Sequence, residues 1–232
     1  MSDTSLQSLN VEMTALNVEH VETLTEEQVE AATEMCDRCY YGDISIKALI
    51  GGNWDIQADY WRSLIRAGLL EGRVYVVKDQ KYQIVSIGVW FEAGNDLFQT
   101  FVYHTMANVS KKGWTKEDKA HRWWCANLAT DPEYQGRGCA TRIVQQALKD
   151  AEENGCTLGL ATGPELNVQK YLAMGFRKRS EEQHDGAVRG ANNDKFRNFP
   201  LVPPDYRDSI CIELCASYPI RSLEFFKLVG AG

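Results

Sequence analysis

The chain has 232 residues, of which 44% are apolar and 25% charged, and its formal net charge is −7. This balance predicts a soluble protein with one sizeable core, a single domain over residues 1–232, because no shift in composition marks a boundary. No apolar run is long enough to span a membrane, and the N-terminus lacks a secretion signal. The basic residues are scattered, so we expect a cytoplasmic protein without a nucleic-acid or membrane partner.

Hydrophobic periodicity predicts helices and strands in alternation, which indicates an α/β fold with a mixed sheet. Thr25 is the expected N-cap of the first helix, and Asn167 that of the last. In chain order, the expected elements are a strand near 17–23, helices at 26–41 and 56–70, a strand hairpin at 73–92, a strand at 122–130, a helix from 140, a strand at 157–161, a helix at 168–174, and strands at 176–180 and 209–217.

Two segments fall outside this pattern. Residues 94–121 form a polar and aromatic insertion, and residues 181–209 form a long polar loop that contains Pro203 and Pro204. A loop of such length inside a compact domain is either a functional lid or disordered. We expect the two segments to cover a binding cleft.

Seven cysteines without a secretion signal predict reduced thiols. Cys36-x2-Cys39 and Cys211-x3-Cys215 have spacings that a zinc site can use, but the first pair lies in a helical pattern and the second in a strand pattern. No histidine is spaced to complete the ligand set. We therefore expect buried thiols and no metal.

The stretch NLATDPEYQGRGCATRIVQQALKDAEENG (127–155) places a glycine-bearing loop between a strand and an amphipathic helix. Free N–H groups at a helix start form an anion site. Gly136 and Gly138 allow close approach of the backbone, and Arg137 adds a positive charge. A P-loop needs a lysine that is absent here, and a Rossmann fingerprint needs a glycine where Thr141 stands. The loop is therefore either a different phosphate site or a turn before a core helix.

The segment LATDPEYQGRGCA resembles the acetyl-CoA-binding motif of the GNAT superfamily of N-acetyltransferases. In that family, Gln/Arg-x-x-Gly-x-Gly/Ala surrounds the pyrophosphate of coenzyme A. Further along, NVQKYLAMGF (167–176) resembles the family's Asn…Tyr-x-x-x-Gly-Phe segment, with Tyr171 four residues before Gly175. The pair of motifs looks most like a fungal branch of small GNAT enzymes.

This resemblance implies a GNAT-like acyltransferase fold, with a central mixed, mostly antiparallel sheet and helices on both faces. It implies an acetyl-CoA-dependent N-acetyltransferase in which the amine of a small molecule attacks the thioester directly in a ternary complex. Acetyl-CoA would be a cosubstrate, no metal would take part, and the enzyme would be a monomer or homodimer. The alternatives are a protein or peptide N-acetyltransferase and a non-catalytic CoA-binding sensor module.

The resemblance also implies roles for individual residues. Tyr171 would protonate the leaving thiolate, although a core aromatic on a helix face is the alternative. No carboxylate lies on the 122–130 strand, so Glu92 is the nearest candidate base by strand pairing, with Asp43 or a water chain as alternatives. Cys139 is not expected to act as a nucleophile. The implied cofactor contacts are Leu128, Ala129, Thr130, Gln135, Gly136, Arg137, Gly138, Cys139, Ala140, Thr141, Asn167 and Tyr171.

The acceptor side is suggested by an aromatic-rich stretch. Residues 90–124 contain eight aromatic side chains, which would form the wall of a pocket for a small, partly apolar amine. Trp90, Phe91 and Trp124 are the expected substrate contacts. The alternative is that these aromatics pin the insertion to the sheet.

Overall fold

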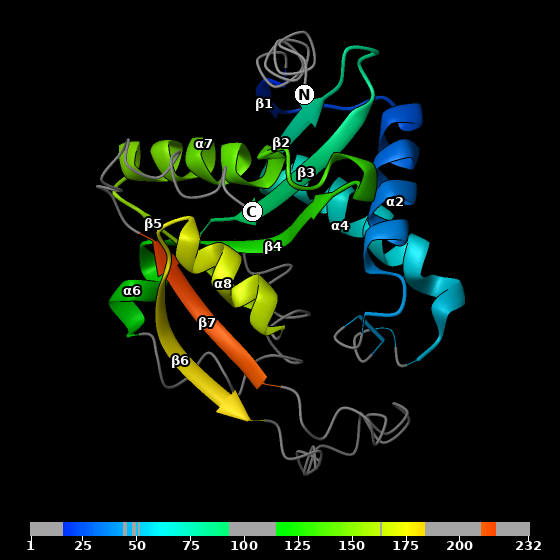
Figure 1. Cartoon of the computed structure of the whole chain (residues 1–232). Helices are drawn as coiled ribbons and strands as arrows, with labels where there is room; N and C mark the ends of the chain where they lie inside the picture. Colours follow the sequence, from blue (N-terminus) through cyan, green and yellow to red (C-terminus); the bar gives the residue numbers. More distant parts are fainter. Residues whose placement is uncertain are drawn as a thin grey trace, which may run out of the picture.

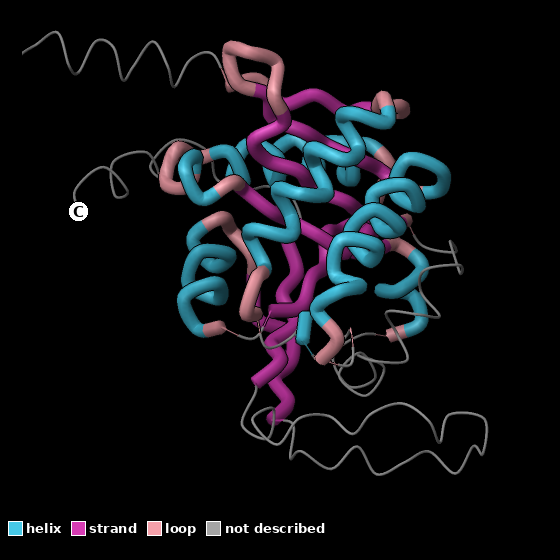
Figure 2. Tube along the Cα trace, turned by 90° about the vertical axis from the view of Figure 1, so that its right-hand side faces the viewer, coloured by secondary structure: helices cyan, strands magenta, loops and turns pink. Residues whose placement is uncertain are grey.

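The computed structural model describes residues 16–43, 46–47, 50, 52–92, 115–162, 164–183 and 210–216. Within them, seven strands form one sheet in the order β1-β2-β3-β4-β5-β7-β6 (Figure 1). The pairing is antiparallel everywhere except between β4 and β5, which are parallel. The strands pass between helices on both faces (Figure 2), which confirms the expected mixed, mostly antiparallel architecture.

The elements lie close to the boundaries that the sequence predicts. They are β1 (Val18–Val21), α2 (Glu26–Tyr40), η1 (Trp54–Ile56), α4 (Gln57–Glu71), β2 (Arg73–Lys78), β3 (Ile84–Phe91), α6 (Lys116–Ala120), β4 (Arg122–Thr130), η3 (Pro132–Tyr134), α7 (Cys139–Glu153), β5 (Thr157–Thr162), α8 (Glu165–Ala173), β6 (Arg177–Gln183) and β7 (Ile210–Ala216). Among the described helices, none is long and apolar enough to cross a membrane.

Helix α7 covers one face of the sheet with the apolar stripe that the sequence predicts. Its inward positions belong to a core cluster that also contains Trp90 and Trp123 from the sheet and Val168 from α8. Burial of such a stripe is what makes an amphipathic helix stable in this position. The buried residues of α7 are Cys139, Ile143, Val144, Ala147, Leu148 and Ala151.

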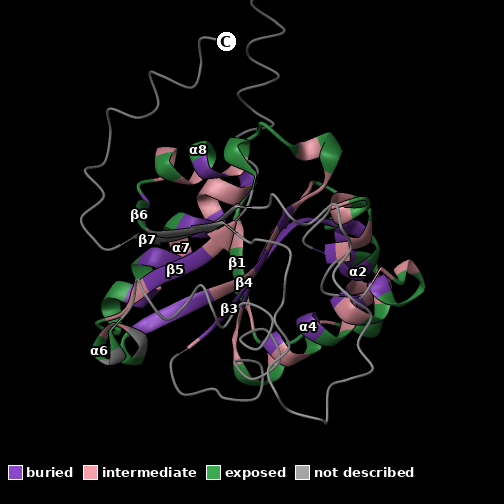
Figure 3. Cartoon of the chain, turned by 90° about the horizontal axis from the view of Figure 1, so that it is seen from below, coloured by how far each residue is buried: buried purple, intermediate pink, exposed green. Residues whose placement is uncertain are grey.

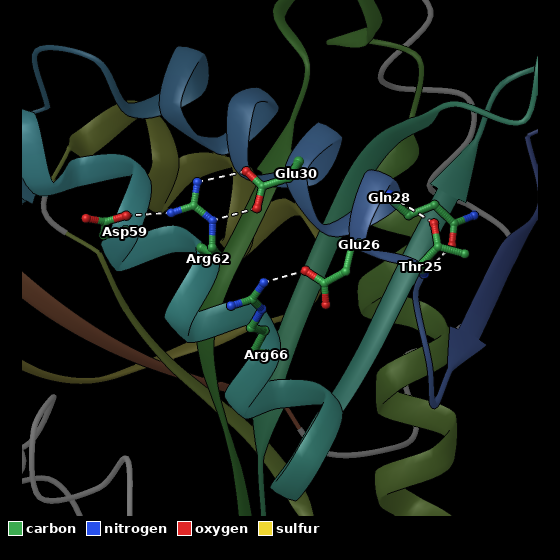
Figure 4. Close-up of polar contacts among 7 residues, drawn as sticks. All are labelled: Thr25, Glu26, Gln28, Glu30, Asp59, Arg62 and Arg66. Atoms are coloured by element: carbon green, nitrogen blue, oxygen red, sulfur yellow. Dashed lines mark hydrogen bonds and ion pairs between the residues drawn. The ribbon is translucent and has the colours of Figure 1, made fainter.

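Helices α2 and α4 cover the other face as an antiparallel pair, with their exposed residues turned outward (Figure 3). Thr25 is the N-cap of α2, as predicted, and it forms a reciprocal capping box with Gln28. Arg62 of α4 holds both carboxylate oxygens of Glu30 at 2.6 and 2.8 Å, and Arg66 pairs with Glu26 one turn away (Figure 4). These contacts fix the alignment of the two helices.

The structure corrects one predicted cap and leaves two segments largely outside the described residues. Helix α8 begins at Glu165 with Pro164 as its N-cap, so Asn167 lies inside the first turn. Of residues 94–121, only 115–121 are described, and they include α6. Of residues 181–209, only 181–183 are described, as the end of β6. The expected cover over a cleft therefore falls on residues outside the description.

Candidate functional site

The two central strands separate halfway along their length. β4 and β5 pair only over Arg122–Trp124 and Thr157–Gly159. β4 then continues to Thr130 alongside β3, while β5 continues to Thr162 alongside β7. From Cys125 onward, the far edge of β4 therefore has no strand partner among the described residues.

The pairing with β3 determines which backbone groups face this open edge. The N–H of Asp131 donates to the carbonyl of Val85 at 2.9 Å. Because peptide groups alternate along an antiparallel strand, Ala129 directs its N–H and C=O toward β3, whereas Leu128 and Thr130 direct theirs away from it. The backbone N–H and C=O groups of Leu128 and Thr130 therefore face the open edge, whereas those of Ala129 are turned toward β3.

A bulge in β4 lies beside the open edge. Val89 pairs with Asn127 and Trp90 with Cys125, so Ala126 is the extra residue. Such a bulge turns neighbouring side chains in a way that regular pleating does not allow. Ala126 packs in the core cluster below α2 and α4, and Asn127 also points to that side, where it bonds to residues of α2.

The glycine-bearing loop leads directly into the start of α7. Gly136 and Gly138 have φ values of 76° and 79°, and a Cβ at either position would meet no atom within 4 Å. Gly138 is the N-cap of α7 and makes no side-chain cap bond, and the first turn of the helix carries no acidic residue. The start of α7 therefore has no side-chain cap, and the space beside both glycines is open, which suits an anion.

Three polar contacts hold this loop in place. Arg38 of α2 forms an ion pair with Asp131 at 2.8 Å. Tyr134 donates its hydroxyl to Asp79 at 3.0 Å, and the Arg137 guanidinium lies over the Tyr134 ring at 4.8 Å. Burial raises the pKa of Asp131, but the bond from Arg38 and a backbone N–H outweigh burial and lower it overall. Arg137 is thus held on the exposed side of the glycine-bearing loop, near the start of α7.

Other predicted cofactor residues of the loop contribute through the backbone or by position. The Cys139 side chain is buried, and burial raises the pKa of its thiol, so Cys139 offers an N–H group but no thiolate. Gln135 folds its side-chain amide back onto the carbonyl of Thr130 at 3.3 Å. Ala140 and Thr141 follow in the first turn of α7, half-buried.

Tyr171 lies on α8, which packs on the same side of the sheet as α7. Its ring contacts Phe176 edge-on, with 5.6 Å between ring centroids. Burial raises the pKa of the phenol, and the neighbouring Cys125 thiol raises it further, so Tyr171 remains protonated at neutral pH. Asn167 lies four residues earlier, on the same face of the helix.

The motifs did not reveal a second phenol near this position. The hydroxyl of Tyr40, the last residue of α2, lies 3.0 Å from both Asn127 Oδ1 and the carbonyl of Leu128. Burial raises the pKa of Tyr40 well above its usual value, and the proximity of Tyr171 and Cys36 raises it further. Tyr40 is 87 residues from Asn127 in sequence, and only the packing of α2 on β4 brings the two together.

Glu92 does not lie with these residues. It follows the last residue of β3, Phe91, which pairs with Trp124, whereas the Gln135–Thr141 loop lies beyond the other end of β4. The carboxylate of Glu92 is bonded to Arg73 at 2.5 Å, in a shallow depression of about 220 Å³ near β1. The structure therefore places Glu92 in an ion pair with Arg73, away from the glycine loop.

The three predicted aromatic contacts do not form one wall. Trp90 is fully buried below α7, and Phe91 points to the opposite face, where it packs with α2 and α4. Alternation along a strand makes this separation unavoidable. Trp124 is 9% exposed, with the guanidinium of Arg122 4.3 Å above its ring.

The predicted thiols are reduced where the structure describes them, and Cys36 and Cys39 both lie on α2 next to β4. Within the described ranges, no group of three or more His, Cys, Asp or Glu side chains is arranged to hold a metal ion.

The central parallel strands separate after Trp124 and Gly159, and β4 then continues to the loop that precedes the uncapped start of α7. Residues 98–176 match the model of the Acetyltransferase (GNAT) family. None of the curated protein sequences searched is similar to the chain.

Solved structures of low sequence identity share the fold. The C-terminal condensation domain of Ebony, in complex with β-alanyl-dopamine, aligns with a TM-score of 0.63 at 12% identity over 88% of this chain and 100% of that one. Histone acetyltransferase HPA2 and related acetyltransferase from Corynebacterium glutamicum gives 0.55 at 11% over 90% and 99%. The ribosomal-protein-S18-alanine N-acetyltransferase from Escherichia coli gives 0.50 at 11% over 90% and 98%.

Proposed function

We propose that the protein is an acetyl-CoA-dependent N-acetyltransferase that transfers an acetyl group to the amine of a small molecule. The family domain and the fold indicate acyl transfer from acetyl-CoA. The observation that carries the proposal is the uncapped start of α7 beside the outward-facing peptide groups of Leu128 and Thr130. The anion site would suit the pyrophosphate of coenzyme A, and the row of backbone donors would suit the carbonyl groups of its pantetheine arm.

In this proposal, Gln135–Thr141 bind the pyrophosphate, and the N–H groups of Leu128 and Thr130 bind carbonyl oxygens of pantetheine and the thioester. A donor on the thioester oxygen stabilises the negative charge that develops as the amine attacks. The amine nitrogen bonds to the acetyl carbon in a ternary complex, the C–S bond breaks, and Tyr171 gives its proton to the thiolate. Asn167 contacts pantetheine from the first turn of α8.

The proton of the attacking amine needs a separate acceptor. An alkylamine with a pKa near that of lysine, about 10.4, is mostly protonated at neutral pH. The carboxylate of Glu92 is bonded to Arg73, and Glu92 lies at the end of the β3–β4 pairing that is remote from the glycine loop. We therefore assign the role of proton acceptor to solvent water. An aromatic amine of low pKa is already neutral at this pH and would depend least on such an acceptor.

The small-molecule acceptor is supported by the eight aromatic residues between 90 and 124. Trp90 and Phe91 are buried on opposite faces, so this support lies with Trp124 and the aromatics of the insertion. A protein or peptide acceptor is the second candidate, since the structures of similar fold include a ribosomal-protein N-acetyltransferase as well as a domain with β-alanyl-dopamine. We further propose a cytoplasmic monomer or homodimer without a metal.

Thermal melting with acetyl-CoA, with ATP and NAD as controls, tests this function. A ligand at 100 times its dissociation constant stabilises a protein by about 2.7 kcal/mol, which corresponds to a shift of a few degrees at this size. We expect a shift with acetyl-CoA alone, followed by thiol release when the correct amine is added. The absence of a shift with acetyl-CoA would remove the cofactor site and the function with it.

A further inference from the structure

The backbone carbonyls and N–H groups at the open edge of β4 differ in whether α2 bonds to them. Its two outward carbonyls are held by side chains of α2: the Tyr40 hydroxyl donates to Leu128 O at 3.0 Å, and the Cys39 thiol donates to Thr130 O at 3.2 Å. The N–H groups of the same two strand residues face the same edge. Burial raises the pKa of the Cys39 thiol to about 11, so this group keeps its proton and remains a donor. The edge therefore offers donors to a ligand, while α2 occupies its acceptors.

Tyr40 is held by its ring as well as by its hydroxyl. The ring stacks on Trp61 of α4, with 4.6 Å between centroids, and Trp61 is 1% exposed. This stacking fixes the ring independently of the hydroxyl bond. A phenylalanine at position 40 would keep the ring contact and lose only the oxygen.

Asn127 determines which acceptor the phenol serves. A phenol has one proton, so Tyr40 cannot donate to Leu128 O and Asn127 Oδ1 together. Exchanging the oxygen and nitrogen of the Asn127 amide keeps every heavy-atom position. In the structure as it stands, Nδ2 donates to the Cys36 sulfur at 3.3 Å. In the exchanged orientation, Nδ2 would donate to the Tyr40 oxygen, and the Cys36 thiol, whose pKa burial raises to about 12, would donate to Oδ1. Each polar group of this four-residue network would then have a hydrogen-bond partner, and the Tyr40 hydroxyl would donate its proton to the Leu128 carbonyl.

We propose that Tyr40 is a positioning residue of the acetyl-transfer site, which holds the Leu128 carbonyl so that the N–H of Leu128 is directed at the thioester carbonyl of acetyl-CoA. This inference rests on the proposed function. The inference follows from a continuous run of hydrogen bonds, Cys36–Asn127–Tyr40–Leu128, which ends on the backbone carbonyl of Leu128 at the open edge. Asn127 is 3% exposed, so the network is shielded from water.

Comparison of two ligands isolates this role without knowledge of the acceptor. CoA has the pyrophosphate and pantetheine of acetyl-CoA but lacks the thioester carbonyl. Dissociation constants for both ligands are measured by isothermal titration on the full chain, on Tyr40→Phe and on Tyr41→Phe. Tyr41 is the matched control because it is the adjacent tyrosine, its side chain is 78% exposed, and it has no place in the network.

In Tyr40→Phe, we expect the ratio of the acetyl-CoA to the CoA dissociation constant to rise about three- to tenfold, which is the scale of one hydrogen bond. The ratio should not change in Tyr41→Phe. A role of Tyr40 in folding alone would weaken both ligands equally, and an equal loss or an unchanged ratio overturns the proposal.

A second variant covers the case in which Tyr40→Phe does not fold. Asn127→Ala removes the group that orients the phenol, and we expect the same ratio to rise in it. Circular dichroism and melting confirm the fold of each variant beforehand. If the unaltered protein binds neither CoA nor acetyl-CoA, the proposed function itself fails. If it binds both and neither variant changes the ratio, only the role of Tyr40 fails.

Discussion

Trp124 of β4 and Gly159 of β5 form the last residue pair before the two central strands separate. A Cβ at Gly159 would lie 2.7 Å from Cδ of Arg122 and 3.1 Å from Cε3 of Trp124. The strands can therefore approach here because residue 159 has no side chain. This close approach lies at the end of β4 opposite to the glycine loop.

Two glycine substitutions in the central sheet should differ in cost. At Gly88 a Cβ would lie 2.2 Å from the rigid indole of Trp90 and 2.7 Å from Ile143, whereas at Gly159 it would meet the more adaptable stem of Arg122. Overpacking of a core costs about 1–3 kcal/mol. We expect Gly88→Ala to lower the free energy of unfolding by an amount at or above the upper end of this range, and Gly159→Ala to lower it by less. Urea unfolding measures both free energies of unfolding. A Gly88→Ala protein as stable as the original would contradict the packing of α7 described here.

Gly138 and Gly155, near the two ends of α7, allow strain to be separated from ligand contact. Both have positive φ, 79° and 65°, and a Cβ at either would meet no protein atom within 4 Å. Alanine in this conformation costs about 1–2 kcal/mol, so both substitutions should lower stability by a similar amount. Only Gly138→Ala places a methyl group at the expected pyrophosphate site, and we expect its acetyl-CoA dissociation constant to rise about tenfold or more. Equal affinities for the two variants would show that the loop does not hold the pyrophosphate.

Local sequence signals predicted the parts of the site that lie within one or two consecutive elements. The β4 strand, the glycine loop and α7 follow from a period change and from glycines at the helix start, and the N-cap at Thr25 follows from its residue type. Asn167 shows the limit of such signals. A capping residue type was present, but Pro164, three residues earlier, fixed the helix start because its φ is already near helical values.

Residues that reach the site through tertiary packing were not predictable. Tyr40 belongs to an ordinary amphipathic helix and meets Asn127 only because α2 packs on the β4 bulge. Glu92 lies away from the glycine loop for the converse reason. Strand pairing was inferred correctly, but the antiparallel direction places Glu92 next to the end of β4 that is remote from the glycine loop. Knowledge of which strands pair does not by itself say at which end of the partner strand a residue lies.

The ion pairs between α2 and α4 should differ in their effect on stability (Figure 4). Arg62 bonds both oxygens of Glu30 as well as Asp59, and its side chain is 26% exposed, whereas Arg66 is 48% exposed and pairs with Glu26. Bidentate, partly shielded pairs are better held than exposed ones. We expect Arg62→Met to lower the free energy of unfolding more than Arg66→Met, with the difference reduced in 1 M salt. Equal effects in urea unfolding would contradict this ranking.

The same pair predicts a pH dependence. The hydrogen bonds from Arg62 lower the pKa of Glu30 in the folded protein, and burial opposes this only in part. A lowered folded pKa means that the stabilisation is fully present above the unfolded value of about 4.3 and is lost as the pH falls through the folded value. The stability difference between the original protein and Arg62→Met should therefore shrink below about pH 4. A constant difference from pH 7 to pH 2.5 would show that the Arg62 side chain acts by packing instead.

Tyr171→Phe should separate an enzyme from a CoA-binding module. Burial keeps the Tyr171 phenol protonated, so its O–H group is available to the leaving thiolate as the C–S bond breaks. General acid catalysis contributes about 10²–10⁴-fold, so kcat should fall at least about 100-fold while the acetyl-CoA dissociation constant changes less than about twofold. The measurement is thiol release with a panel of aromatic amines, alkylamines and peptides. Tyr82→Phe, at a side chain that is 79% exposed, is the control.

The outcome of Tyr171→Phe depends on where the hydroxyl acts in the reaction. An interaction made only with the developing thiolate lowers kcat and kcat/KM equally, whereas lost binding of acetyl-CoA raises KM alone. A parallel fall in kcat and kcat/KM would assign the phenol to the leaving group. Full turnover in the variant would leave Tyr171 as a core aromatic on α8. Acetyl-CoA binding by the original protein without turnover on any amine class would instead favour the non-catalytic module.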